Sequence, residues 1–318
     1  MCKLLVFLLI VVSSLPLGAA PYTIAVLPKG NYEFWRIVHA GAIKAQQELG
    51  REGIEVNLIW EYPERQEDSE AQAQIITRLM GEKVSGFVLA PMNSRTLAPA
   101  VEAAALANIP TVVIDSNLRS NAQVAYIATE NSTSGALAAR TLGKLLGGKG
   151  RIIVFRYKKG AGASDARVAN FVEVIKNLFP DIQVDAEQYN ATGMDSAKLV
   201  GVQLVQLFNQ EDVGIFCPNG PTTLGLLEAL QGTGEANKMK VVGFDAVPKT
   251  VAALKRGELR GLLVQNPEKM GYLGVKTVVA RLRGEPFEKT IGTECMLITP
   301  DTVNNPALAA LVNPPMAP

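Results

Sequence analysis

Residues 109–115 read Ile109-Pro110-Thr111-Val112-Val113-Ile114-Asp115, and this stretch indicates the type of fold. An apolar, β-branched run follows a proline and ends in a carboxylate. A strand without polar alternation has both faces buried, which is typical of parallel sheets covered by helices. A helical pattern from Thr96 to Ala107 precedes the run, and Asn108-Ile109-Pro110 marks the boundary between the two. The stretch therefore predicts one βα repeat of a doubly wound sheet.

The same alternation extends in both directions along the chain. In the first half, the expected strands are 23–27, 56–60, 86–90 and 111–115, and the expected helices are 34–50, 69–80 and 96–107. In the second half, the expected strands are 151–155, 182–187, 214–217 and 240–245, and the expected helices are 167–178, 195–208 and 223–230. Two successive βα sets of similar length predict an α/β protein of two doubly wound, parallel-sheet lobes.

The N-terminus has the pattern of a secretory signal peptide. Lys3 is followed by an apolar run from Leu4 to Val12 and then by the small residues Gly18-Ala19-Ala20. The run is shorter than the roughly 20 apolar residues that span a bilayer. Cys2 precedes the run, so it cannot be the lipid-bearing cysteine that follows a lipoprotein signal. We expect residues 1–20 to be removed and the mature protein to be soluble in the periplasm.

Composition excludes several classes of partner. The chain has 31 basic and 30 acidic residues, so its balanced charge gives no electrostatic reason to bind nucleic acid or an anionic membrane surface. The single histidine, His39, and the lack of CxxC or HxxxH spacing argue against a metal site. Cys217 and Cys295 could pair in an exported protein, but their apolar strand-like contexts favour two free, buried cysteines.

Motifs that would indicate an enzyme are incomplete. Residues 143–150 nearly spell a phosphate-binding loop, but Gly150 replaces the required Ser or Thr and the segment runs from helix to strand. Residues 160–165 resemble a dinucleotide fingerprint in which Asp165 replaces the third glycine. There is no Gly-x-Ser-x-Gly elbow. We therefore expect no catalytic residue, no cofactor and no enzymatic activity.

Polar and aromatic residues gather where the expected strands end. Ligands of open parallel sheets bind beyond the carboxyl ends of the strands. Rings that stack on C–H faces, together with charged groups that bind hydroxyls, make a site suited to a sugar. The candidates from strand ends and following loops are Lys29, Asn31, Phe34, Trp35, Asp115, Arg167, Asn219, Asp245 and Gln265.

Each candidate also has a structural explanation. The aromatic residues could be core anchors, and the cations could be solvated surface residues. Asp115, Asp245 and Asn219 could cap helices. Any one of them alone would be a weak indication. Their shared location favours a binding site.

With these residues placed, the chain resembles the periplasmic sugar-binding proteins of the ribose-binding type, which have the periplasmic binding protein type 1 fold and supply ABC transporters. The matching segments are 34–35, 39–42, 109–115, 126–131, 242–245 and 264–267. The resemblance implies a monomer that closes around a sugar and hands it to a membrane permease. It also implies that residues 21–129 and 266–291 form an N-terminal lobe and residues 130–265 and 292–318 a C-terminal lobe.

Three hinge crossings are then expected near residues 129–130, 265–266 and 292–295, and the Pro-rich end, residues 313–318, is expected to be loosely held. By the same resemblance, Phe34 and Trp35 sandwich the sugar ring, Asp115 binds hydroxyls, and Met194 stands where a further aromatic is usual. The remaining polar set, from the C-terminal lobe and the hinge, is Arg167, Asn219, Asp245 and Gln265.

Departures from the ribose-type pattern keep other ligands open. Ser116 replaces an arginine, Ala90 replaces an asparagine, and the first loop carries Lys29. Lys29 and the Asp115-Ser116 pair are similar to the matching residues of the autoinducer-2 receptors of this fold. Autoinducer-2 or a polyol is therefore an alternative ligand. A receptor that presents its closed form to a chemoreceptor or histidine kinase is a further alternative. The effector domain of a LacI-type repressor shares the architecture, but this N-terminus has no helix-turn-helix pattern.

Overall fold

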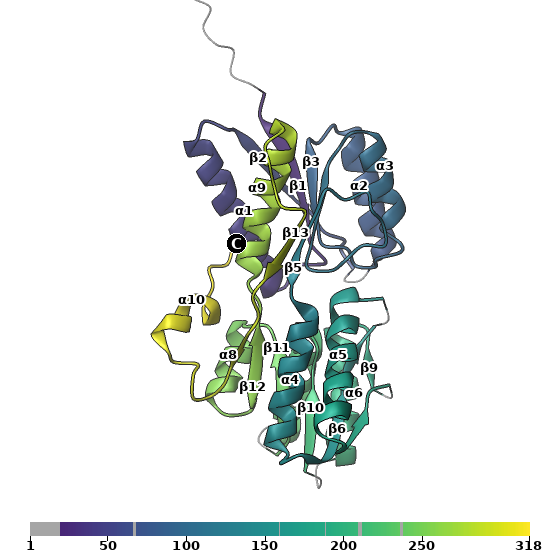
Figure 1. Ribbon diagram of the computed structural model, residues 1–318, viewed down its shortest axis with the longest axis vertical. Coiled ribbons are helices and arrows are strands. Elements are labelled where there is room, and N and C mark those ends of the chain that lie inside the picture. The colour runs from purple at the N-terminus through teal and green to yellow at the C-terminus, as the bar shows by residue number, and fades with distance from the viewer. Residues whose placement is uncertain (1–19, 66–67, 159, 188, 209–211, 236–237) are drawn as a thin grey trace, which may run out of the picture.

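The computed structural model describes residues 20–318, except 66–67, 159, 188, 209–211 and 236–237. Two α/β lobes lie end to end, joined by extended segments between them (Figure 1). The expected signal peptide lies outside the described residues, apart from Ala20. Over the described ranges, no helix combines the length and apolar character needed to cross a membrane.

The N-terminal lobe (N-lobe) is built on a six-stranded sheet in which all neighbours are parallel. In spatial order its strands are β13 (Thr290–Thr293), β5 (Ala125–Thr129), β4 (Thr111–Ile114), β3 (Gly86–Leu89), β1 (Tyr22–Leu27) and β2 (Val56–Trp60).

Helices cover both faces of this sheet, as the unbroken apolar strands require. On one face α1 (Glu33–Arg51) and α9 (Pro267–Arg283) pack over Ile24 and Val26. On the other face α2 (Ser69–Gly81) and α3 (Ala98–Leu106) pack over the alternate residues of the same strand. Side chains that alternate between two buried faces explain why β1 shows no polar period.

The C-terminal lobe (C-lobe) repeats the plan with one antiparallel edge. Its strands, in spatial order, are β14 (Met296–Ile298), β12 (Gly261–Val264), β11 (Lys240–Phe244), β10 (Val213–Phe216), β6 (Lys149–Val154) and β8 (Asp181–Asp185), with β14 antiparallel to β12. A separate short pair joins β7 (Arg156–Tyr157) to β9 (Asn190–Ala191). The expected α/β architecture of two doubly wound lobes is thus confirmed.

The C-lobe helices also lie on both faces of their sheet. They are α4 (Asn131–Leu145) and α5 (Gly162–Leu178) on one face, α6 (Met194–Phe208), α7 (Gly220–Thr233) and α8 (Pro248–Lys255) on the other, and the short α10 (Ala309–Val312) after a 3₁₀ turn at Pro306–Leu308.

The contact between α4 and α5 is close enough to require glycine. A Cβ on Gly135 would lie 2.1 Å from the carbonyl oxygen of Arg167, so only glycine lets α5 approach α4 at this height. This approach sets the position of Arg167, the buried cation of the site described below.

The chain crosses between the lobes three times. β5 leads into α4 at Glu130, β12 leads into α9 through Gln265 and Asn266, and β13 leads into β14 through Glu294 and Cys295. At the third crossing, Gly292 and Thr293 still pair with β5, so the N-lobe sheet extends two residues beyond the expected boundary at 291. Cys217 is buried, Cys295 is half-buried, and both are free.

The C-terminal segment differs from expectation. Residues 313–318 were expected to be loosely held, yet Ala317 is buried and its backbone bonds to Arg36 of α1. Proline-rich composition predicts the lack of helix in this segment but cannot show that the N-lobe offers it a docking surface.

Candidate ligand-binding site

A cavity lies between the lobes where the carboxyl ends of both sheets face each other. Its empty space, including the open mouth, is about 660 Å³. The lining residues are Lys29, Tyr32, Phe34, Trp35, Met92, Asp115 and Ser116 from the N-lobe, Tyr157, Lys158, Ala161, Ala163, Ser164, Arg167, Asn219, Pro221 and Asp245 from the C-lobe, and Gln265 from the hinge.

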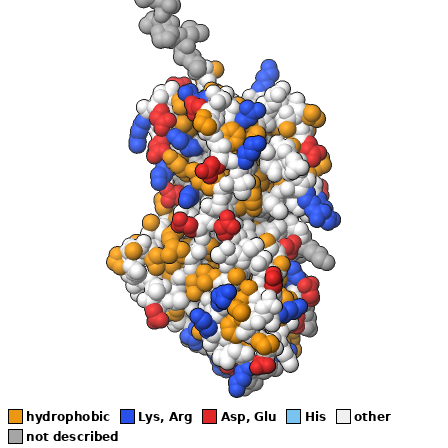
Figure 2. All heavy atoms as spheres, viewed as in Figure 1, with side chains coloured by type: hydrophobic (Ala, Val, Ile, Leu, Met, Phe, Trp, Pro, Cys, Tyr) orange, Lys and Arg blue, Asp and Glu red, His pale blue; other side chains and the backbone are white. Residues whose placement is uncertain are grey.

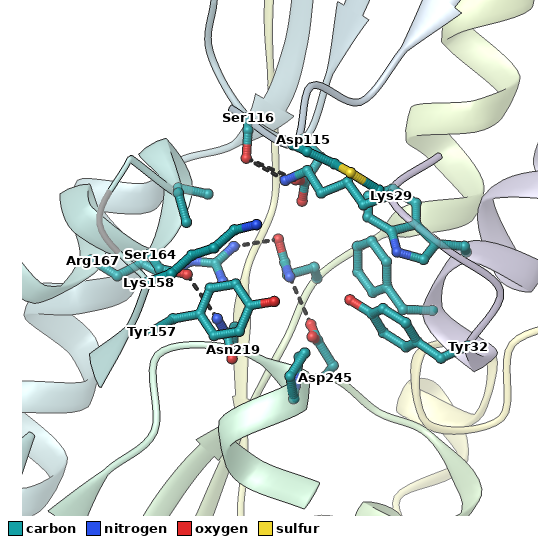
Figure 3. A pocket seen from close by; sticks show the side chains of 17 residues that line it. Lys29, Tyr32, Asp115, Ser116, Tyr157, Lys158, Ser164, Arg167, Asn219 and Asp245 are labelled. Atoms are coloured by element: carbon teal, nitrogen blue, oxygen red, sulfur yellow. Dashed lines mark hydrogen bonds and ion pairs between the residues drawn. The ribbon is translucent and has the colours of Figure 1, made fainter. Parts of the chain in front are cut away.

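On the N-lobe side, a lysine compensates a buried aspartate. Lys29 Nζ lies 2.5 Å from Asp115 Oδ2 and 2.6 Å from Ser116 Oγ, and Ser116 Oγ donates to the same carboxylate oxygen at 2.9 Å (Figure 3). Burial raises the pKa of Asp115, but the charges of Lys29 and Arg167 and the bonds from Lys29 and Ser116 outweigh it and leave the pKa below its usual value. Asp115 is therefore ionised, and both donors converge on Oδ2. Among the described residues, none donates to Oδ1.

On the C-lobe side, Arg167 is held rigidly rather than solvated. It is 2% exposed, and its guanidinium donates to the side-chain oxygen of Asn131 and the carbonyl of Pro218, both at 2.8 Å. The guanidinium also lies 4.1 Å from the ring centre of Phe244, within cation–π range. Because protein groups hold the Arg167 guanidinium on several sides, its remaining edge faces the cavity in one fixed orientation.

Gln265 joins this cation to the second aspartate of the cavity. Its Oε1 accepts from Arg167 Nη2 at 2.7 Å, and its Nε2 donates to Asp245 Oδ1 at 2.6 Å. The first amide of α7, Gly220 N, donates to Asp245 Oδ2 at 2.9 Å. Burial raises the pKa of Asp245 above its usual value although Arg167, Gln265 and Gly220 lower it.

The two aspartates occupy corresponding places in the two lobes. Asp115 follows β4 with φ +64°, and Asp245 follows β11 with φ +73°. Left-handed backbone is uncommon for residues other than glycine and is characteristically found at functional sites, where the surrounding structure enforces it. Each lobe thus turns sharply at a strand end and points one carboxylate into the shared cavity.

Aromatic rings line the cavity from both lobes. Phe34 and Trp35 stand at the start of α1 with ring centres 4.9 Å apart and an edge-to-face angle of 86°. Both are also nearly inaccessible and belong to the N-lobe core, so the core-anchor and site explanations apply together. Tyr32 and Tyr157 extend from opposite lobes with their hydroxyls directed toward each other (Figure 3).

The lobes touch at the rim of this cavity. A Cβ on Gly162, the first residue of α5, would lie 2.3 Å from the side-chain oxygen of Asn117, which follows the Asp115-Ser116 turn of the N-lobe. Side-chain approach of this kind across the gap indicates that the structure represents the closed arrangement of the two lobes.

The structure brings eight of the ten candidate residues together. Those that line the cavity are Lys29, Phe34, Trp35, Asp115, Arg167, Asn219, Asp245 and Gln265. Asn219 also caps α7, since its Oδ1 accepts from Thr222 N at 3.0 Å. Asp245 does not cap its own following helix; its carboxylate accepts from the start of α7 instead.

Asn31 and Met194 lie elsewhere. Asn31 is exposed in the loop before α1, and Met194 is half-buried at the start of α6, outside the cavity lining. The expected aromatic of the C-lobe is supplied instead by Tyr157, because the short β7–β9 pair carries that residue to the cavity.

Sequence reasoning also missed several lining residues. Besides Tyr157 they are Tyr32, Met92, Ser116, Lys158 and Ser164 together with small apolar groups. Ser116 lies just after the end of β4 and Tyr32 lies in the loop after β1, so the strand-end rule could have found both. Met92 and Ser164 depend on loop paths that composition does not specify.

The described residues contain no cluster of three or more His, Cys, Asp or Glu side chains arranged to hold a metal ion. The groups that meet in the cavity are carboxylates, amides, hydroxyls, cations and rings, which is the chemistry of reversible binding.

Comparison with known proteins agrees with this geometry. Residues 24–286 match the periplasmic binding protein domain. The chain is 26% identical to the ribose import binding protein of Bacillus subtilis, over 80% of each chain, and 25% identical to the D-allose-binding periplasmic protein of Escherichia coli, over 85% of this chain and 87% of that one.

Solved structures superpose over nearly the whole chain. A carbohydrate-transporter solute-binding protein from Agrobacterium radiobacter, in complex with D-arabinose, is 30% identical with a TM-score of 0.84, covering 93% of this chain and all of that one. The periplasmic component of a sugar ABC transport system from Hahella chejuensis is 31% identical with a TM-score of 0.81, covering 88% of this chain and all of that one. These relatives are solute-binding proteins rather than enzymes. The chain therefore belongs to the periplasmic binding protein family.

Proposed function

We propose that this protein binds a monosaccharide or a similar polyhydroxylated molecule between its lobes and delivers it to the permease of an ABC transporter. The observation that carries the proposal is the pair of buried carboxylates, Asp115 and Asp245, one from each lobe, facing one cavity that aromatic rings also line. Relatives of this chain are described as binding ribose, D-allose or D-arabinose.

The charges at the centre of the site favour an uncharged ligand. Lys29 compensates Asp115, and Arg167 acts on both aspartates. A ligand there need not bring a counter-charge, but it must satisfy carboxylate and guanidinium groups with hydroxyls. Charge-assisted hydrogen bonds of this kind are short and about twice as strong as neutral ones.

Closure follows from the distribution of these groups over two lobes. A ligand shifts an equilibrium between open and closed forms only by its difference in affinity for them. A sugar that bonds Asp115 in one lobe and Asp245 in the other makes its full set of contacts only when the lobes meet. The closed form is then the form presented to the permease, in the periplasm after export under the direction of residues 1–20.

A thermal-shift screen against pentoses, hexoses and polyols tests the proposal. Saturating ligand at a hundredfold over its Kd adds about 2.7 kcal/mol of stability, enough to raise the Tm measurably. The Asp115→Ala variant is the control and should bind the same sugar with a loss of about 1.5–3 kcal/mol. If no sugar or polyol raises the Tm of the wild-type protein, the proposed ligand class is wrong.

Autoinducer-2 is a second candidate ligand, and the Lys29–Asp115 contact is the observation that favours it. It belongs in the same screen. A shift with autoinducer-2 alone would indicate a sensing role, including presentation to a chemoreceptor, in place of nutrient uptake.

A further inference from the structure

The C-terminal tail, residues 313–318, connects the two lobes without being one of the three hinge crossings. It begins after α10, where Val312 is 4% exposed and packs in the main core of the C-lobe, together with Leu308 and Leu311. Apolar side chains gather on the surface where α10 and the tail lie (Figure 2). The start of the tail is therefore fixed to the C-lobe.

The end of the tail is held by the N-lobe. Arg36 Nε donates to the carbonyl of Ala317 at 2.8 Å, and Ala317 N donates to the carbonyl of Arg36 at 3.0 Å. Ala317 is 4% exposed. Arg36 lies in the first turn of α1, directly after the two aromatic residues that line the ligand cavity. Reciprocal bonds between two residues fix the tail against this turn in position and direction.

A second, smaller cavity is lined both by α10 and the tail and by residues of the ligand cavity. Its wall includes Leu311 and Pro314 on the side of α10 and the tail, and Phe34, Asp245 and Gln265 on the other. These last three residues also line the ligand cavity. These three residues therefore border both the ligand cavity and the cavity beside the tail.

We propose that the tail is a fourth, non-covalent connection between the lobes, which docks on Arg36 when the lobes close and favours the closed form. Hinge rotation moves α10 with the C-lobe and Arg36 with the N-lobe. Opening the cleft then separates the tail from Arg36, whereas the three covalent crossings only bend. The two bonds are made in one form alone, which is the condition for shifting an equilibrium.

The distance between lobes can be measured without any sugar, so the test does not depend on the proposed ligand. In a chain whose free Cys217 and Cys295 are replaced by alanine, spin labels at Leu106→Cys on α3 and Leu199→Cys on α6 occupy strongly exposed positions, one on each lobe. Pulsed electron paramagnetic resonance then gives the populations of short and long distances. The variants are a chain that ends at Val312, Ala317→Pro, which removes one donor, and Arg36→Met, which keeps the apolar stem.

A net hydrogen bond changes an equilibrium by roughly 2- to 12-fold. Each point variant should lower the ratio of closed to open molecules by such a factor, and the shortened chain by more. Arg36→Met in the shortened chain should have no further effect, because its partner is absent. Arg51→Met, at the exposed end of the same helix, is the matched control and should resemble wild type.

Equal distance distributions in the wild type, Arg36→Met and Ala317→Pro would overturn the proposal. Circular dichroism spectra and melting curves show whether each variant is folded. If the shortened chain does not fold, the two point variants decide the question.

Discussion

The side chains of Gln265 and Thr129 are hydrogen-bonded at 2.7 Å, and this contact links two of the hinge crossings to the ligand site. The oxygen of Gln265 that accepts from Thr129 also accepts from Arg167, while its amide donates to Asp245. A single buried side chain therefore connects the segment that bends to a cation and a carboxylate that face the ligand.

Replacing Gln265 by Leu should destabilise the protein by about 2–4 kcal/mol, because buried groups of Thr129, Arg167 and Asp245 each lose a partner. Urea unfolding measures the change. Gln183→Leu, on the exposed edge of the C-lobe sheet, is the control and should lie within about 0.5 kcal/mol of wild type. A Gln265→Leu protein as stable as the control would show that these groups find other partners.

The Lys29→Met variant should reverse the contribution of Asp115 to the pH dependence of stability. In wild type the pKa of Asp115 is below its usual 3.8, so this residue stabilises the fold above that pH and the contribution is lost as pH falls through the lowered pKa. Without Lys29, we expect burial to dominate and raise the pKa. Stability from Asp115 is then present in acid and lost as pH rises through the raised value.

Urea unfolding between pH 3 and 7 compares the two proteins. Lys44→Met removes an exposed lysine paired with Glu268 at 2.9 Å and should leave the pH profile unchanged. Parallel profiles for wild type and Lys29→Met would contradict the assignment of Lys29 as the main compensating charge.

Of the two tryptophans, only Trp35 should report ligand binding. Trp35 lines the cavity, whereas Trp60 stacks on His39 with ring centres 4.2 Å apart and is absent from the lining. Trp35→Phe should abolish the fluorescence change caused by a sugar identified in the thermal screen, and Trp60→Phe should preserve it. A signal that survives in Trp35→Phe but not in Trp60→Phe would place the ligand elsewhere.

Tyr157→Ala should weaken sugar binding by roughly tenfold, since it removes the aromatic surface that the C-lobe contributes. Met194→Ala, at the position first expected to provide that surface, should change the Kd by less than twofold. Isothermal titration distinguishes these outcomes. The opposite ranking would restore Met194 to the site and remove Tyr157.

Gly135→Ala should destabilise the protein by about 1–3 kcal/mol, because the new methyl group would lie 2.1 Å from the carbonyl oxygen of Arg167 and push α5 away from α4. Gly50→Ala in α1 meets nothing within 4 Å and should instead stabilise by about 0.5–1 kcal/mol through helix propensity. Thermal unfolding of the two variants tests whether the close approach of α5 to α4, rather than helix propensity, determines the sign of the stability change at Gly135.

The sequence allowed the repeat of strands and helices to be predicted because apolar strands such as 111–114 are buried on both sides and carry no competing pattern. It also located eight of the seventeen residues that line the cavity, since residues that follow strand ends meet at one edge of a parallel sheet. Asp115 and Asp245 could be placed by this rule alone.

The rule failed where the path of a loop decides the outcome. Asn31 follows a strand end yet is exposed to solvent, and Tyr157 reaches the cavity because it belongs to the short β7–β9 pair. The docking of Ala317 on Arg36 joins residues from opposite ends of the chain, and no local propensity encodes such a contact.

The interleaving of the lobes along the chain constrains how the protein can be assembled. Strand β13 completes the edge of the N-lobe sheet and α9 covers one of its faces, yet both follow nearly all of the C-lobe in sequence. During synthesis, the part of the sheet face that α9 later covers beside α1 remains exposed until the second lobe has been made. The N-lobe cannot be produced as a contiguous fragment, and a chaperone that meets the unfinished chain would find the apolar surface that later receives α9.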